Sequence, residues 1–126
     1  MSPSRRDLGA FGERLAAAHL EAKGYRIRER NFRCPEGEID IVAEDGDCLV
    51  FVEVRARRGD ALGTPAESVT AAKERRLVAV ATAYLQEHDS LPANQRIDVV
   101  TVELTPQGRL LAVRHIEGAV TDQEPA

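Results

Sequence analysis

Two acidic residues on neighbouring predicted strands are the strongest candidates for chemistry in this sequence. Asp40 and Glu53 lie in two apolar, β-branched runs separated by Asp45-Gly46, a dipeptide that favours a tight hairpin turn. Because side chains alternate along a strand, a two- or four-residue connection centred on Asp45-Gly46 sets Asp40 opposite Phe51, with Glu53 as its diagonal neighbour. A three-residue loop with a bulge would shift the register by one residue and place Asp40 on the other face.

Two carboxylates that converge on an apolar sheet need a partner, because an uncompensated buried charge is costly. A divalent cation is one such partner, since Mg²⁺ prefers carboxylate, carbonyl and water oxygens. An ion pair between Glu53 and Arg55 or Arg57 on an exposed face of the sheet explains the same charges without a metal. The hairpin by itself leaves both interpretations open.

The motifs around these carboxylates resemble a known family. Gly37-Glu38-Ile39-Asp40 and Phe51-Val52-Glu53-Val54-Arg55-Ala56-Arg57, with Gly12-Glu13 before them and Lys73 after them, are similar to the YraN-like family of small bacterial proteins, from about Leu8 to Ala119. The resemblance implies a restriction-endonuclease-like fold similar to that of archaeal Holliday-junction resolvases. In that wider superfamily an Asp precedes a strand that carries Glu-x-Lys. Here Arg55 stands where Lys is usual, and Ile39 stands where Pro is usual.

The resemblance also implies an activity: a Mg²⁺- or Mn²⁺-dependent endonuclease that hydrolyses phosphodiester bonds in DNA, with branched or junction DNA as a candidate substrate. Asp40, Glu53 and the carbonyl of Val54 would hold the cation, and Glu13 would hold a second cation or a bridging water. A helical Glu13 that pairs with a neighbouring basic residue at the surface is the alternative. Resolvase-like relatives act as dimers, which implies a homodimer.

Arg55 and Lys73 are the candidates for stabilising the charge that develops on the phosphate. An arginine is a poor proton carrier because its pKa is very high, so a lysine from a neighbouring helix would suit this role. Lys73 lies four residues before Leu77 and extends the buried-facing stripe of a predicted helix, although a surface lysine with a packed stem has the same spacing. Arg55 in place of Lys leaves two alternatives open: a non-catalytic nucleic-acid-binding protein on the same fold, and a protein-interaction domain.

Basic residues form three groups that could bind phosphates. Arg26, Arg28 and Arg30 alternate along one predicted strand and would form a row on one face. The same row also suits an edge strand that uses charge to prevent aggregation. With the groups at the end of the third strand and in the first turns of the second helix, the predicted nucleic-acid-binding residues are Arg26, Arg28, Arg30, Arg33, Arg57, Arg58, Lys73 and Arg76.

Hydrophobic periodicity predicts the elements that must position these residues. Apolar residues at helical spacing predict helices over 7–23, closed by Gly24, and over 71–88, beginning at Thr70 or with a capping box at Thr64. Strands are predicted over 25–33, 37–44, 48–57, 96–103 and 109–116. The order α-β-β-β-α-β-β indicates an α/β domain with a mixed sheet, in which the second helix crosses over to a parallel fourth strand. We expect one nuclease-like domain over 1–120 and a flexible tail over 121–126.

Composition narrows the classes of function. The net charge is −4 over 126 residues, so nucleic acid would have to bind a local basic patch. Aromatic residues make up 4% of the chain with no Trp, which disfavours a protein that stacks single-stranded bases. Cys34 and Cys48 form no zinc motif and predict free thiols. The lack of a signal peptide and of a long apolar run predicts a cytoplasmic protein without a membrane span.

Asp98 and the histidines are predicted to be structural. Arg96 lies two residues from Asp98 on the same strand face, so we expect an ion pair rather than a metal ligand. His19, His88 and His115 lie in different elements, and we expect surface or packing roles for them.

Overall fold

The part of the chain that the structure describes forms one five-stranded mixed sheet with two helices. The computed structural model describes residues 5–59 and 70–120. The elements are α1 (Arg5–Ala22), β1 (Arg26–Cys34), β2 (Gly37–Asp45), β3 (Cys48–Arg58), α2 (Ala71–Glu87), β4 (Asn94–Leu104) and β5 (Leu110–Val120). The strand order is β1-β2-β3-β4-β5, and neighbours are antiparallel except β3 and β4, which are parallel and connected through α2. The predicted element order and the mixed α/β class are confirmed.

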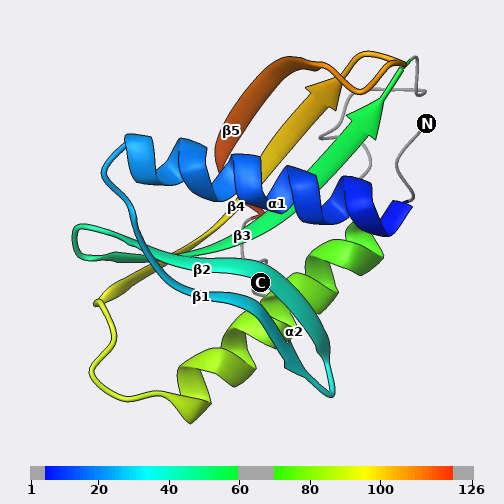
Figure 1. Cartoon of the computed structure of the whole chain (residues 1–126). Coiled ribbons are helices and arrows are strands. Elements are labelled where there is room, and N and C mark those ends of the chain that lie inside the picture. The colour runs from blue at the N-terminus through cyan, green and yellow to red at the C-terminus, as the bar shows by residue number, and fades with distance from the viewer. Residues whose placement is uncertain (1–4, 60–69, 121–126) are drawn as a thin grey trace.

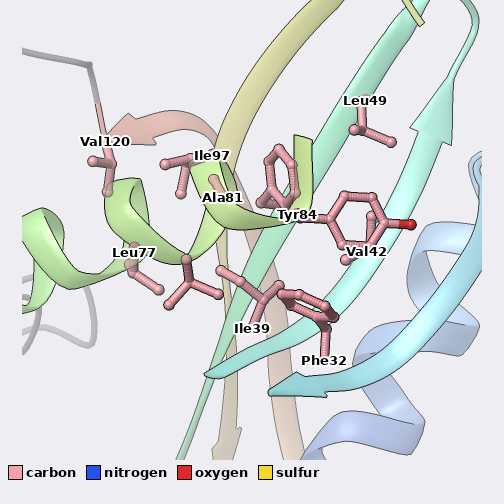
Figure 2. Close-up of a cluster of buried hydrophobic side chains, with 11 residues drawn as sticks. Phe32, Ile39, Val42, Leu49, Leu77, Ala81, Tyr84, Ile97 and Val120 are labelled. Carbon is pink, nitrogen blue, oxygen red and sulfur yellow. The ribbon is translucent and has the colours of Figure 1, made fainter. Parts of the chain in front are cut away.

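The two helices cover opposite faces of the sheet (Figure 1). On one face, Leu20 of α1 packs with Ile41 and other aliphatic residues of β2 and β3. On the other face, Tyr84 of α2 packs with Val42 in the core drawn in Figure 2. Because successive residues of β2 enter different cores, this strand is buried on both faces, which explains its nearly continuous apolar run.

A Schellman motif ends α1. Gly24 has a φ of 93°, and its amide donates to the carbonyl of Glu21 at 3.0 Å. The amide of Tyr25 donates to the carbonyl of Leu20 at 3.1 Å, which completes the motif. The predicted cap at Gly24 is therefore confirmed.

The turn between β2 and β3 lies one residue later than predicted. The loop residues are Gly46 and Asp47, and Gly46 has a φ of 59° at the position where a type II′ turn places glycine. The register moves by two residues, so Asp40 keeps its predicted face. The predicted pairing of Asp40 with Phe51 is wrong, because Phe51 pairs with Val42.

A bulge interrupts the alternation that was predicted for β1. Arg28 is the extra residue of a register shift between β1 and β2. On either side of this bulge, Arg26 pairs with Glu44 and Arg30 pairs with Ile41. Their partners on β2, Glu44 and Ile41, are three residues apart, and residues three apart in a strand face opposite ways. Arg26 and Arg30 therefore lie on opposite faces of the sheet. The prediction of one arginine row is wrong for this reason.

Thr70 is the N-cap of α2, and its side chain accepts a hydrogen bond from the amide of Lys73 at 3.3 Å. This confirms the later of the two predicted helix starts. The alternative start at Thr64, most of the loop around it and the predicted tail over 121–126 lie outside the described residues. Neither described helix combines the length and the apolar character needed to cross a membrane.

Candidate functional site

An open cleft of about 700 Å³ lies where β2 and β3 separate. Backbone pairing between these strands runs as far as Ile41 and Val52. Residues from β1, β2, β3 and α2 line the cleft: Arg33, Cys34, Gly37, Glu38, Asp40, Glu53, Arg55, Lys73, Arg76 and Leu77. Acidic side chains of β2 and β3 and basic side chains of β1, β3 and α2 therefore line the same cleft.

Asp40 lies at the point where the two strands separate. Continuation of the register would set it opposite Glu53, and the amide of Val54 donates a hydrogen bond of 2.8 Å to Asp40 Oδ2. Burial and repulsion by Glu53 raise the pKa of Asp40 above its ordinary range, against the lowering effect of the hydrogen bond from Val54. The amide and carbonyl of one extended residue point to the same side of a strand, so the Val54 carbonyl also points toward β2.

Helix α1 brings a third carboxylate to this point. A Cβ atom at Gly12 would lie 2.8 Å from the Cβ of Ala56, so the helix approaches β3 as closely as glycine permits. The next residue, Glu13, faces Asp40. Burial, repulsion by Asp40 and hydrogen bonding with it raise the pKa of Glu13 to about 7. Glu13 and Asp40 are far apart in the sequence, but the fold brings their carboxyl groups close enough to interact electrostatically.

Glu38 is a fourth carboxylate, and it is not among the predicted ligands. Carboxylate oxygens of Glu13, Glu38 and Asp40 all lie within 4.8 Å of one another. Glu38 also pairs with Arg33 at 3.5 Å and keeps 38% of its side chain exposed. Its place in the Gly37-Glu38-Ile39-Asp40 motif, two residues before Asp40, was the signal that could have identified it.

Glu53 and Arg55 are neighbours on β3. Glu53 Oε1 lies 3.9 Å from Arg55 Nε, and the two side chains are 18% and 23% exposed. This contact is the predicted ion pair that would explain the charges of Glu53 and Arg55 without a metal. Arg55 Nε is nevertheless buried without a hydrogen-bond partner among the described residues. A cation with free hydrogen-bonding capacity beside a cleft suits an anionic ligand.

Three basic residues that line the cleft form what we call its basic wall. Lys73 and Arg76 lie one turn apart on α2 and both line the cleft, as does Arg33 of β1. A Cβ atom at Gly37, where φ is 145°, would lie 3.0 Å from both Cγ and Cδ of Arg76. The stem of Arg76 therefore packs on the backbone of Gly37, which limits where its guanidinium can go. The structure brings these predicted phosphate-binding residues to the predicted metal ligands.

Two other predicted phosphate-binding residues have acidic partners away from the cleft. Arg28 donates to Glu44 Oε2 at 3.1 Å and to the hydroxyl of Tyr84 at 3.1 Å, and these bonds raise its pKa. Arg26 lies 3.4 Å from the same carboxylate. Arg26 is the cross-strand partner of Glu44, and Arg28 is the bulge residue two positions later.

Three further arginines are outside the cleft lining. Arg30 lies close enough to Glu13 that its charge opposes the rise in the pKa of that carboxyl. Arg57 and Arg58 are the last two residues of β3, beyond the residues that line the cleft. Their roles in binding nucleic acid remain predictions.

A second polar cluster is centred on Asp98, which is fully buried. Arg96 donates to it through Nε at 2.8 Å and Nη2 at 3.0 Å, so the predicted ion pair is confirmed and raises the pKa of Arg96. The amide of Gly118 donates to Asp98 at 2.9 Å, and His115 Nε2 lies 2.6 Å from it. His115, for which we expect a surface or packing role, is thus a direct partner of the buried Asp98. These contacts satisfy Asp98 and identify the cluster as structural.

Comparison with known proteins identifies the family. The family model described as uncharacterised protein family UPF0102 matches residues 12–102. The chain is 55% identical to a UPF0102 protein of Symbiobacterium thermophilum over 105 residues, which cover 83% of this chain and 89% of the relative. It is 49% identical to a UPF0102 protein of Roseiflexus castenholzii over 125 residues, which cover 97% and 99% of the two chains. The resemblance to the YraN-like family is confirmed, and the chain belongs to the uncharacterised protein family UPF0102.

Proposed function

We propose that this chain is a metal-dependent endonuclease that hydrolyses phosphodiester bonds in DNA, with Mg²⁺ or Mn²⁺ as its cofactor. The observation that carries the proposal is the convergence of carboxylates from α1, β2 and β3 at one cleft that basic residues also line. Glu13, Asp40 and Glu53 are the residues involved, and they coincide with the residues implied by the resemblance to restriction-endonuclease-like proteins.

The donor set fits a hard divalent cation. It consists of carboxylate oxygens, which Mg²⁺ and Mn²⁺ prefer to nitrogen or sulfur. Burial raises the pKa of Glu13 and of Asp40, repulsion by Asp40 adds to the rise at Glu13, and repulsion by Glu53 adds to the rise at Asp40. A bound cation would offset these effects. Asp40, Glu53 and the carbonyl of Val54 would hold one cation. Glu13, now joined by Glu38, would hold a second cation or a bridging water.

The chemistry that such a cation supplies is a lower pKa of its water ligand and stabilisation of charge on the phosphate. The residues of the chain prepare the site for it. The amide of Val54 orients the carboxylate of Asp40. Arg55 and Lys73 would bind the non-bridging oxygens of the scissile phosphate, where negative charge develops. In the metal-free protein Glu13 has a pKa of about 7 and exchanges a proton near neutral pH, and a bound cation would favour its charged form.

A nucleic-acid-binding protein without catalysis is the second candidate, and Arg55 is the observation that favours it. Arg55 lies 3.9 Å from Glu53 and carries a permanent charge, so it cannot exchange a proton as a lysine can. Phosphate binding by the basic wall would survive this replacement. Substitution of Arg55→Lys separates the two candidates, because a gain in cleavage without a gain in DNA affinity would mark the arginine as the catalytic defect.

The test is a cleavage assay on labelled four-way junction, flap, duplex and single-stranded DNA, with Mg²⁺, Mn²⁺ or EDTA. Wild-type protein is compared with Glu53→Gln, which removes a predicted ligand with little change of shape. Glu103→Gln is the matched control, because Glu103 lies on β4 and pairs with Arg114 at 3.5 Å, outside the cleft lining. We expect metal-dependent cleavage by wild type and the control, and none by Glu53→Gln.

Each outcome of this assay has a definite meaning. Cleavage that is equal in Glu53→Gln and wild type would contradict the proposed site. Binding to DNA without cleavage would favour the binding protein. No affinity for any DNA at low salt would favour a protein-interaction domain instead.

The proposal extends to partners and location. A two-fold substrate such as a four-way junction is matched by a homodimer, and sedimentation with and without junction DNA would detect one. A DNA substrate implies the cytoplasm in a bacterium, and the two half-buried free thiols, Cys34 and Cys48, suit a reducing compartment.

A further inference from the structure

Asn31 lies where β1 changes the faces of its side chains. Its φ is 57°, a left-handed conformation that Asn adopts more readily than most other residues. Arg30 pairs with Ile41, and Phe32 pairs with Ile39. Ile41 belongs to the core under α1, whereas Phe32 and Ile39 belong to the core under α2. Residues two apart in a regular strand share a face, so both strands change faces between these pairs.

The residue across from Asn31 in this register is Asp40. The face change therefore occurs in β2 at the central carboxylate of the cleft, and in β1 at Asn31. Asn31 supplies the backbone conformation that the change requires on β1. Its side chain is consequently next to the acidic cluster.

The amide of Asn31 connects two of the carboxylates. Carboxylate oxygens of Glu13 and Glu38 face this amide, so its nitrogen is assigned to the side toward them. In that orientation it donates to Glu13 Oε1 at 2.8 Å and to Glu38 Oε1 at 3.1 Å. Glu13 comes from α1 and Glu38 from β2, so one side chain joins the helix layer to the sheet. An amide can donate two hydrogen bonds without a positive charge, whereas Lys or Arg in this place would repel a cation.

We propose that Asn31 is a positioning residue that holds Glu13 and Glu38 at the spacing in which they receive a divalent cation. This inference rests on the proposed function and deepens it. The hydrogen bonds offset the repulsion between carboxylates before a cation arrives. Loss of the amide should therefore weaken metal binding while leaving the fold and the basic wall intact.

The experiment measures Mn²⁺ affinity by calorimetry on the full chain without DNA. Asn31→Gly keeps the left-handed backbone and removes the amide, and we expect it to bind Mn²⁺ about 10-fold or more weakly than wild type. Ser90→Gly is the matched control, because Ser90 is the other described non-glycine residue with a positive φ, 59°. It should bind Mn²⁺ as wild type does. Affinity for DNA in EDTA depends on the basic side chains of the cleft, and it should be unchanged in both variants.

Asn31→Asp distinguishes a positioning residue from a ligand. Asp tolerates the same backbone but cannot donate at neutral pH, so we expect it to bind Mn²⁺ no better than Asn31→Gly. Tighter binding in Asn31→Asp than in wild type would make residue 31 a ligand and overturn the inference. Wild-type affinity in Asn31→Gly, with binding lost in Glu53→Gln, would overturn the inference alone. Absence of Mn²⁺ binding by wild type would overturn both the inference and the proposed function.

Discussion

The carboxylate cluster should make this protein less stable as the pH rises, and Glu13→Gln should remove part of that loss. Glu13 has its pKa raised from an ordinary value of 4.5 to about 7, mainly by burial and by Asp40. The folded state therefore binds more protons than the unfolded state between these values. Stability is fully present below about pH 4.5 and is lost as the pH rises through about 7.

The size of the effect follows from the same values. The difference between 4.5 and about 7, at about 1.36 kcal/mol per pKa unit, sets an upper bound of about 3.4 kcal/mol. Partial exposure of Glu13 and the proton shared with Asp40 reduce this to about 1–2 kcal/mol. For a domain of this length, the change corresponds to about 4–8 °C in Tm.

The assay is thermal unfolding in EDTA at pH 5 and at pH 8. Glu13→Gln should melt about 4–8 °C above wild type at pH 8 and close to wild type at pH 5, because neutral Gln resembles the protonated carboxyl. Mn²⁺ should raise the Tm of wild type more than that of the variant, since the ion replaces the missing proton. An equal difference between the two proteins at both pH values would refute the electrostatic reasoning.

Three further substitutions test particular contacts. Gly37→Ala forces a Cβ to within 3.0 Å of the Arg76 stem at a φ of 145°, so it should lower Tm and weaken DNA binding in EDTA, measured by fluorescence anisotropy. Thr101→Val removes a fully buried hydroxyl that has no partner among the described residues, and should raise the free energy of unfolding in urea by about 1 kcal/mol or more; a loss would mean that the hydroxyl is satisfied. Asp98→Ala removes the fully buried carboxylate that pairs with the half-buried Arg96 and accepts from the amide of Gly118, and should cost about 3–5 kcal/mol in the same urea assay, with little change in Mn²⁺ affinity.

Much of the fold could be predicted because its signals are local. The Schellman motif at Gly24 depends on one glycine that follows the apolar stripe of α1. The N-cap at Thr70 depends on one hydroxyl that precedes the apolar stripe of α2. The ion pair of Arg96 with Asp98 needed only the two-residue spacing of a strand. Such features are decided within a few residues, so the sequence displays them directly.

The predictions that were wrong or incomplete concern pairing between strands and contacts between separate segments. The arginine row of β1 was wrong because Arg28 forms a bulge, and nothing in the local sequence distinguishes a bulge from regular alternation. The pairing of Asp40 with Phe51 was wrong by two residues because Gly46, rather than the Asp45-Gly46 pair, sets the turn. Glu38 and Asn31 were missed as partners of Glu13 because α1 and β1 contribute to the cluster from separate segments.

The sequence by itself indicated Asp40 and Glu53 as candidate cation ligands, because both lie on one predicted hairpin, and Glu13 through the family resemblance. It also determined the class of fold, because hydrophobic periodicity depends on local geometry. Only the tertiary structure decided that Glu13 meets Asp40, since this contact depends on how closely Gly12 lets α1 approach β3. Only the tertiary structure showed the cleft, because its lining residues come from β1, β2, β3 and α2, which are separate segments of the sequence.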